Sequence, residues 1–187
     1  METVNIVLCG LGGQGILFMT RVLAQAALDK GFNVIGAETH GMAQRGGSVI
    51  SHLRLGEAES SLVRIGTAHL LLSLDSIEVY RNLPFLSRGG KMYVNADQKE
   101  FPSNDVKALL VKREITYRAL PAVAIAQALG APRSSNLALL GFFAAFDEEP
   151  LTYDELKNTI GTISPERFKA INSMVFEEGY KRGLGYG

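Results

Sequence analysis

The pattern best suited to chemistry is a glycine run near the start of the chain, Gly10-Leu11-Gly12-Gly13-Gln14-Gly15. It follows a stretch typical of a strand and precedes a pattern typical of a helix. In such a turn, Gly10 permits a tight bend, Gly12 lets the backbone approach a pyrophosphate, and Gly15 lets helix and strand pack closely. The helix start adds free N–H groups and partial positive charge. The run, with Gly13 and Gln14, therefore predicts a phosphate-binding loop, and the alternative is a tight turn without a ligand.

An acidic residue stands where a dinucleotide-binding protein would need one. Glu38 ends the second expected strand, close to the point about 20 residues after the glycines where an acid binds a ribose hydroxyl. The glycine run and this acid together favour a dinucleotide site. Glu38 by itself is more often a solvated strand end, so both interpretations stay open.

A second polar loop is less generic than the first, and it reads His40-Gly41-Met42-Ala43-Gln44-Arg45-Gly46-Gly47-Ser48. In a doubly wound sheet it would lie at the same edge as the first loop. Arg45 offers a planar fork of donors for a phosphate or carboxylate, and Gly46-Gly47 expose backbone N–H groups beside it. The loop predicts an anion-binding or partner-docking site that includes His40, Gln44 and Ser48. The alternative is a flexible polar connection.

Weaker candidates follow other strands. Asp75 directly follows one further expected strand and Asn95 ends another, so both can line the same edge. His40, His52 and His69 show no metal-ligand spacing, and we expect no metal site. We interpret His52 as a structural residue within a strand. Neither a nucleophile elbow nor the lysine of a Walker loop is present, so we assign no catalytic residue.

The elements that must position these residues alternate between strands and helices. We expect strands at residues 4–9, 33–38, 48–55, 68–74, 91–95 and 114–120, with a turn at Gly89-Gly90. We expect helices at residues 14–30, 122–129 and 136–146, and two more towards the end of the chain. This order predicts a Rossmann-like α/β fold, a doubly wound and mostly parallel sheet flanked by helices.

The starts of the last two helices carry capping signals. Thr152 with Glu155 three residues later predicts a capping box. Ser164-Pro165 predicts an N-cap followed by a first-turn proline. We expect the last helix to turn Phe168, Ile171 and Val175 inward.

Composition narrows the possible functions. The 187 residues include 19 basic and 19 acidic side chains, and this balance argues against a general nucleic-acid binder. We expect one domain over residues 1–187. The apolar runs are too short to span a membrane, and without a basic leader we expect a cytoplasmic protein. The single cysteine, Cys9, excludes an internal disulfide and an iron–sulfur cluster held by this chain alone, and we expect it to be a packing residue.

Together these residues resemble the gamma-type subunits of 2-oxoacid:ferredoxin oxidoreductases over about residues 4–180. The resemblance rests on the glycine run with Ile16, on the loop from His40 to Val49, and on Ser135-Asn136 with Leu140-Gly141 in a late helix. The second loop is most similar to that of the beta subunit of indolepyruvate oxidoreductases. On this resemblance Asn136 joins the candidate binding residues.

The resemblance implies a subunit of an enzyme that oxidatively decarboxylates a 2-oxoacid to an acyl-coenzyme A. Members of this family use thiamine diphosphate and iron–sulfur clusters and pass electrons to ferredoxin. The thiamine-binding motif, Gly-Asp-Gly followed by paired asparagines, does not occur in this sequence. Both cofactors would therefore lie on partner subunits, and this chain would form a wall near the coenzyme A channel.

The residues leave two other classes open. One is an NAD(P)-dependent dehydrogenase, favoured by the glycine run and Glu38 but left with little room for a catalytic half. The other is a non-catalytic nucleotide-binding or interaction domain.

Overall fold

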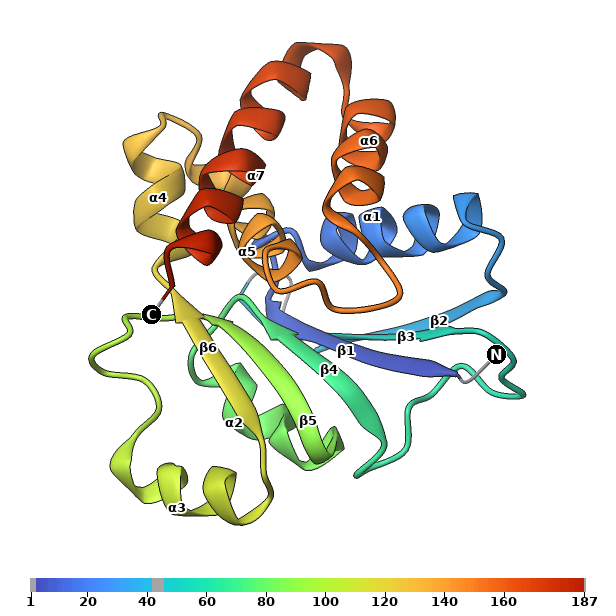
Figure 1. The fold of residues 1–187 in the computed structure, drawn as a ribbon, viewed down its shortest axis with the longest axis vertical. Coiled ribbons are helices and arrows are strands. Elements are labelled where there is room, and N and C mark those ends of the chain that lie inside the picture. Colours follow the sequence, from blue (N-terminus) through green and yellow to red (C-terminus); the bar gives the residue numbers. More distant parts are fainter. Residues whose placement is uncertain (1–2, 42–45, 187) are drawn as a thin grey trace.

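The computed structural model describes residues 3–41 and 46–186 of the chain. Six strands form one sheet in the order β2-β3-β1-β4-β5-β6 (Figure 1). The strands are β1 Val4–Leu11, β2 Val34–His40, β3 Ser48–Leu55, β4 Ala68–Ser73, β5 Leu86–Asn95 and β6 Thr116–Leu120. Every expected strand is present. The turn expected at Gly89-Gly90 is wrong, because both glycines lie within β5, where its pairing with β4 shifts register.

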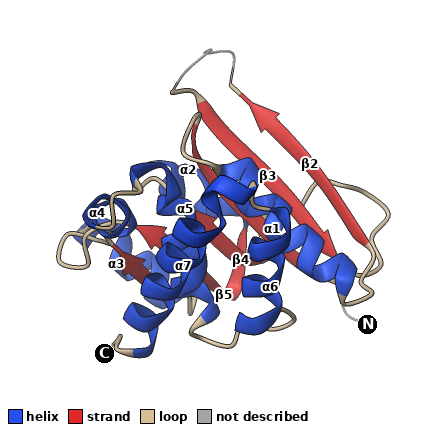
Figure 2. Ribbon diagram, turned by 90° about the horizontal axis from the view of Figure 1, so that it is seen from above, coloured by secondary structure: helices blue, strands red, loops and turns tan. Residues whose placement is uncertain are grey.

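The strand directions explain where the loops gather. β1 pairs parallel with β4, β4 with β5, and β5 with β6. β3 is the exception, because it pairs antiparallel with both β1 and β2 and so separates them. Figure 2 shows β2 at the outer edge of the sheet, on the far side of β3 from the helices. The predicted α/β fold with a mostly parallel sheet is confirmed, with one antiparallel strand inserted.

Helices cover both faces of the sheet (Figure 1). One face carries α1 Ile16–Asp29, α4 Ala122–Ala128, α5 Ser135–Ala144, α6 Tyr153–Ile163 and α7 Lys169–Leu184. The other carries α2 Glu78–Asn82 and α3 Asn104–Lys112, neither of which we expected from the sequence. Side chains of β1 alternate between the two cores, since Ile6 and Leu8 enter one and Val7 and Cys9 the other. Within the described residues, no helix has both the length and the apolar character needed to cross a membrane.

The core of the larger face is built on α5, every residue of which is buried. This confirms the core helix expected at 136–146. α7 crosses α5 so closely that a methyl group at Gly179 would stand 2.0 Å from the Ala138 carbonyl oxygen. At Gly141 it would stand 1.9 Å from the Phe176 carbonyl oxygen. Glycine is therefore required where the two helix backbones meet.

The expected caps had different outcomes. Thr152 and Glu155 form the predicted capping box of α6, with the Thr152 amide donating to Glu155 Oε2 at 2.8 Å. The N-cap predicted at Ser164 is wrong. The Ser164 hydroxyl instead accepts a hydrogen bond from Asn172 Nδ2 at 2.9 Å.

The last helix accordingly starts later than its sequence signals suggest. A 3-10 turn at Glu166–Phe168 precedes α7. Phe168 is exposed, so its predicted place on the inward face is wrong, whereas Val175 is buried as expected.

Candidate functional site

The first glycine run forms the link between β1 and α1. Gly13 and Gly15 have φ angles of 95° and 88°, which a side chain would strain. The Leu11 amide donates to Gln14 Oε1 at 2.7 Å, and the Gln14 amide donates to the Leu11 carbonyl at 3.1 Å. Gln14 therefore braces the loop from within, a contribution that its position in the glycine run did not reveal.

The second loop meets the first at the same edge of the sheet, as predicted. The Gly12 amide donates to the Gly47 carbonyl at 2.8 Å, and Leu11 pairs with Ser48 in the β1–β3 register. Gly46 has a φ angle of 73°, which glycine adopts without strain. Gln44 and Arg45, the polar residues predicted to bind in this loop, lie outside the described residues.

Asn136 attaches the first loop to the helical layer. It is 4% exposed at the start of α5, and its Nδ2 donates to the Gly15 carbonyl at 3.1 Å. Its Oδ1 accepts from the Leu137 amide at 3.0 Å. Because a Cβ atom at Gly15 would stand 2.7 Å from Asn136 Nδ2, the close approach depends on glycine as well.

Asp75 and Asn95 lie at the same edge, where their side chains support the backbone. Asp75 Oδ1 accepts from the amides of Ile77 and Glu78 at 2.9 and 3.0 Å. Asn95 Nδ2 donates to the Leu74 carbonyl at 3.1 Å, and its Oδ1 accepts from the Val123 amide at 3.2 Å. These two residues therefore tie together the turns that follow β4, β5 and β6.

The structure adds two residues that the sequence did not indicate, Glu78 and Arg81. Glu78 is buried beneath the second loop, where its Oε2 accepts from the Ser48 hydroxyl at 2.6 Å. Its Oε1 lies 2.7 Å from Nη1 of the exposed Arg81. Neither residue belongs to a motif, and only the packing of α2 under the sheet reveals that Glu78 is buried.

Glu38 and His40 are not brought to the glycine run. Both side chains are exposed on β2, where His40 Nε2 lies 3.7 Å from Glu38 Oε2. Glu38 pairs with Ser51 of β3, and β3 separates it from β1. In a dinucleotide-binding fold the acid stands on the strand next to β1. The inserted strand thus removes the geometry on which the dinucleotide interpretation depended.

His52 and Cys9 are structural, as expected. His52 Nδ1 accepts from the Val63 amide at 3.3 Å, and its ring meets Phe85 edge to face. The Cys9 thiol donates to the Ser73 hydroxyl at 3.3 Å, and burial raises its pKa to about 12. A buried protonated thiol of this kind is unreactive.

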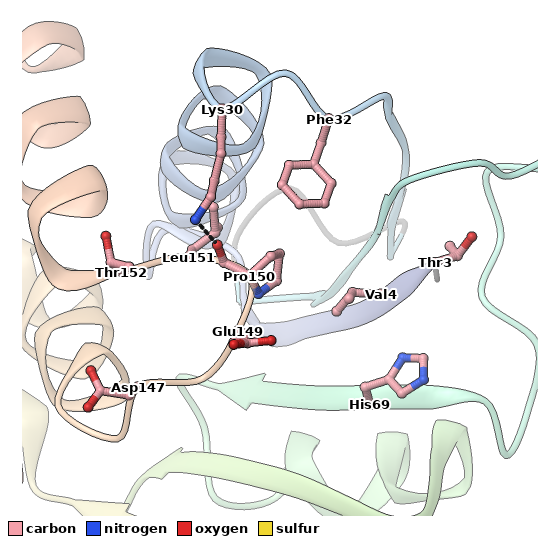
Figure 3. Close-up of a pocket in the computed structure, with 10 residues that line it drawn as sticks. All are labelled: Thr3, Val4, Lys30, Phe32, His69, Asp147, Glu149, Pro150, Leu151 and Thr152. Atoms are coloured by element: carbon pink, nitrogen blue, oxygen red, sulfur yellow. Dashed lines mark hydrogen bonds between the residues drawn. The ribbon is translucent and has the colours of Figure 1, made fainter. Parts of the chain in front are cut away.

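A cavity that the sequence did not indicate lies at the opposite edge of the sheet (Figure 3). Its volume is about 770 Å³, and its lining includes Val4 and His69 near the starts of β1 and β4. Lys30 closes one side, donating to the Pro150 carbonyl at 2.7 Å and pairing with Glu155 at 2.9 Å. Acidic and basic side chains both line it, so its charge favours no single ligand class.

At the edge of the sheet where the two glycine loops meet, the described residues offer exposed backbone and a few side chains that hydrogen-bond to the backbone. We assign no catalytic acid, base or nucleophile among them. The chain belongs to the pyruvate ferredoxin/flavodoxin oxidoreductase family, whose model matches residues 5–182.

Individual relatives agree with this assignment. The chain is 33% identical to indolepyruvate oxidoreductase subunit IorB of Methanothermobacter thermautotrophicus, over 94% of this chain and 95% of that one. The keto/oxoacid ferredoxin oxidoreductase gamma subunit of Geobacter sulfurreducens shares the fold, with a TM-score of 0.77 at 20% identity over 97% and 99% of the two chains. The 2-oxoglutarate:ferredoxin oxidoreductase of Magnetococcus marinus matches with a TM-score of 0.79 at 17% identity, over 100% of this chain and 32% of that one.

The predicted resemblance is thereby confirmed, and the chain is a gamma-type subunit of the 2-oxoacid:ferredoxin oxidoreductase class. The dehydrogenase alternative is not favoured, because Glu38 does not meet the glycine run.

Proposed function

We propose that the chain forms, with thiamine- and cluster-bearing subunits, an enzyme that converts a 2-oxoacid and coenzyme A into an acyl-coenzyme A and carbon dioxide. Two electrons leave through the clusters to ferredoxin, and the proton of the coenzyme A thiol is released. We further propose that the two glycine loops contribute to the coenzyme A site, and that the complex works in the cytoplasm. The observation that carries this proposal is the hydrogen bond from the Gly12 amide to the Gly47 carbonyl, which joins both loops at one edge.

The chemistry of the loops suits an anionic co-substrate. Backbone N–H groups at a helix start attract phosphate, and glycines let a pyrophosphate approach the main chain. The Magnetococcus enzyme, part of whose chain matches all of this one, is known with 2-oxoglutarate, coenzyme A and succinyl-CoA bound. This supports a coenzyme A site in the complex formed by the present chain.

The donor set does not fit a resident cluster. An iron–sulfur cluster usually takes about four thiolates, and the chain has one cysteine, which is buried. Thiamine diphosphate supplies carbanion stabilisation when bound, and we assign it to a partner because its motif does not occur in this sequence. The residues of this chain would then bind and orient the co-substrate.

Purification of the chain from its native host, with its partners attached, tests the proposal. We expect a complex that contains thiamine diphosphate and clusters and reduces a dye when given a 2-oxoacid and coenzyme A. Aryl pyruvates should be compared with pyruvate, 2-oxoglutarate and branched 2-oxoacids. The chain alone should lack this activity, and 2-oxoacid-dependent dye reduction by the isolated chain would contradict the proposal.

An NADH titration of the isolated chain distinguishes the proposed subunit from the dehydrogenase alternative. Tight binding, seen as enhanced NADH fluorescence, would favour that alternative. We expect none, because the acid that would bind the ribose lies across β3 from the glycine run.

A further inference from the structure

The buried carboxylate of Glu78 is placed behind the second glycine loop. It is 1% exposed and accepts the Ser48 hydroxyl at 2.6 Å on one oxygen. Its other oxygen pairs with Arg81 Nη1 at 2.7 Å. Ser48 follows Gly47, whose carbonyl accepts the Gly12 amide at 2.8 Å. Glu78 is therefore two hydrogen bonds away from the first glycine loop.

The backbone of Glu78 is held from both sides. Its amide donates to Asp75 Oδ1 at 3.0 Å, and its carbonyl accepts from Asn82 Nδ2 at 2.9 Å. The carboxylate thus projects from the first residue of α2, whose backbone is held by the Asp75 side chain just after β4. A hydroxyl that binds a fixed carboxylate is itself restricted in position.

Stability does not account well for this arrangement. Desolvating a carboxylate costs free energy that its ion pair returns only in part, and apolar replacements of buried ion pairs are often neutral or stabilising. Arg81 is largely exposed, which weakens the pair further. What the carboxylate does supply is a defined position for Ser48, where the second loop enters β3.

We propose that Glu78 is a positioning residue for coenzyme A binding, acting through Ser48 on the Gly46-Gly47 segment. This inference rests on the proposed function of the glycine loops. One carboxylate oxygen pairs with Arg81, and the other accepts the Ser48 hydroxyl at 2.6 Å, so the carboxylate holds Ser48 in a defined position. Loss of the carboxylate charge frees the loop while leaving the backbone groups that face the ligand intact.

The test uses Glu78→Gln, Ser48→Ala and Ser48→Thr in the purified complex, with Glu148→Gln as a matched control. Glu148 is also a buried carboxylate, 6% exposed, which accepts from Lys91 Nζ at 2.6 Å near the opposite edge of the sheet. We expect Glu78→Gln and Ser48→Ala to raise KM for coenzyme A about tenfold with little loss of kcat. Ser48→Thr keeps the hydroxyl and should therefore have the wild-type KM for coenzyme A. The control Glu148→Gln should also leave the KM for coenzyme A unchanged.

Amide hydrogen exchange of the full chain gives an independent readout. Glu78→Gln should speed exchange in the peptide that contains Gly47 and Ser48, and Glu148→Gln should not.

An unchanged KM for coenzyme A in both Glu78→Gln and Ser48→Ala would overturn the inference, as would equal effects of Glu78→Gln and Glu148→Gln. Gly12→Ala separates the two proposals. If it raises KM while Glu78→Gln does not, only the positioning role fails, and if neither does, the coenzyme A site fails too.

Discussion

The Gly12 amide donates to the Gly47 carbonyl at 2.8 Å, and this bond fixes two loops that are far apart in the sequence. It exists because β3 runs antiparallel beside β1, which brings the start of β3 to the end of β1. Among the described residues, the nearest atoms within 4 Å of a methyl group placed at Gly12 would be backbone atoms of Gly46 and Gly47. Main-chain groups of the two loops therefore meet at this edge, which supports the phosphate-binding site that we propose there.

Substituting glycines of the first loop should distinguish a residue needed for coenzyme A binding from one needed for stability. Among the described residues, the nearest neighbour of a methyl group at Gly12 would be the Gly46 amide nitrogen at 3.5 Å, which is an ordinary contact. We expect Gly12→Ala to leave the free energy of unfolding within about 0.5 kcal/mol of wild type while raising KM for coenzyme A. Urea denaturation and steady-state kinetics of the complex check this.

Gly15→Ala is the contrasting variant. It places a side chain at a φ angle of 88° and 2.7 Å from Asn136 Nδ2, so it should cost about 1 to 3 kcal/mol of stability. Equal stability of Gly12→Ala and Gly15→Ala would contradict this assignment.

Arg45 is the side chain in the second loop that we predict to bind an anion. Arg45→Ala should raise KM for coenzyme A or weaken assembly of the complex, by about tenfold if a charge-assisted hydrogen bond is lost. The free energy of unfolding of the chain itself should stay within about 0.5 kcal/mol. Arg45→Lys should recover only part of the effect, because an ammonium lacks the planar fork. Unchanged kinetics together with an unchanged complex size would count against this role.

Much of the fold could be predicted because its signals are local. The apolar run of β4 and the glycine turn after β1 depend on neighbouring residues alone, and both were located correctly. The meeting of the two glycine loops was also predictable, because strand ends at one edge of a sheet come together.

The remaining features depend on contacts between distant residues. The antiparallel direction of β3 follows from its pairing with β1, and nothing in the residues 48–55 signals it. The burial of Glu78 requires α2 to pack beneath the sheet, and a short helix of five residues has little periodicity to detect. Ser164 is not the N-cap of α7, because it ends α6 and a 3-10 turn at Glu166–Phe168 separates it from α7, an arrangement that a helix-start pattern does not reveal.

The crossing of α5 and α7 predicts a strong and position-specific effect of glycine substitution. Gly179→Ala drives a methyl group to 2.0 Å from the Ala138 carbonyl oxygen, so the helices must separate. We expect a loss of at least about 3 kcal/mol in the free energy of unfolding, at or beyond the upper end for overpacking.

Gly161 in α6 provides the control for this substitution. A Cβ atom there meets no atom of the described residues within 4 Å, so Gly161→Ala should stabilise by up to about 1 kcal/mol through helix propensity. Urea denaturation of both variants gives the comparison, and a Gly179→Ala variant as stable as wild type would show that the helices are not in this contact.

The Cys9 thiol should resist modification in the folded chain. It is fully buried, and burial raises its pKa to about 12, so the thiolate is scarce at about pH 8. A thiol-specific reagent should react with it only at the rate of unfolding, and rapidly once guanidinium unfolds the protein. The chain has no other cysteine, so the measurement reports on this site alone. Fast reaction of the folded chain would place the thiol at the surface.

Tyr93 should make stability depend on pH in alkaline solution. Its side chain is fully buried and donates to Glu148, and burial followed by the hydrogen bond to this carboxylate raises the pKa of the phenol well above its usual value of about 10. Above that value the unfolded chain loses the phenolic proton while the folded chain keeps it. The folded state then binds more protons, so the free energy of unfolding falls as pH rises, by up to about 1.4 kcal/mol per pH unit from this group.

Tyr93→Phe should be less stable than wild type near neutral pH, because Glu148 loses a donor, and its stability should fall less steeply above about pH 10. Urea denaturation of both proteins across this range measures the two slopes, and parallel slopes would show that Tyr93 does not retain its proton in the folded chain.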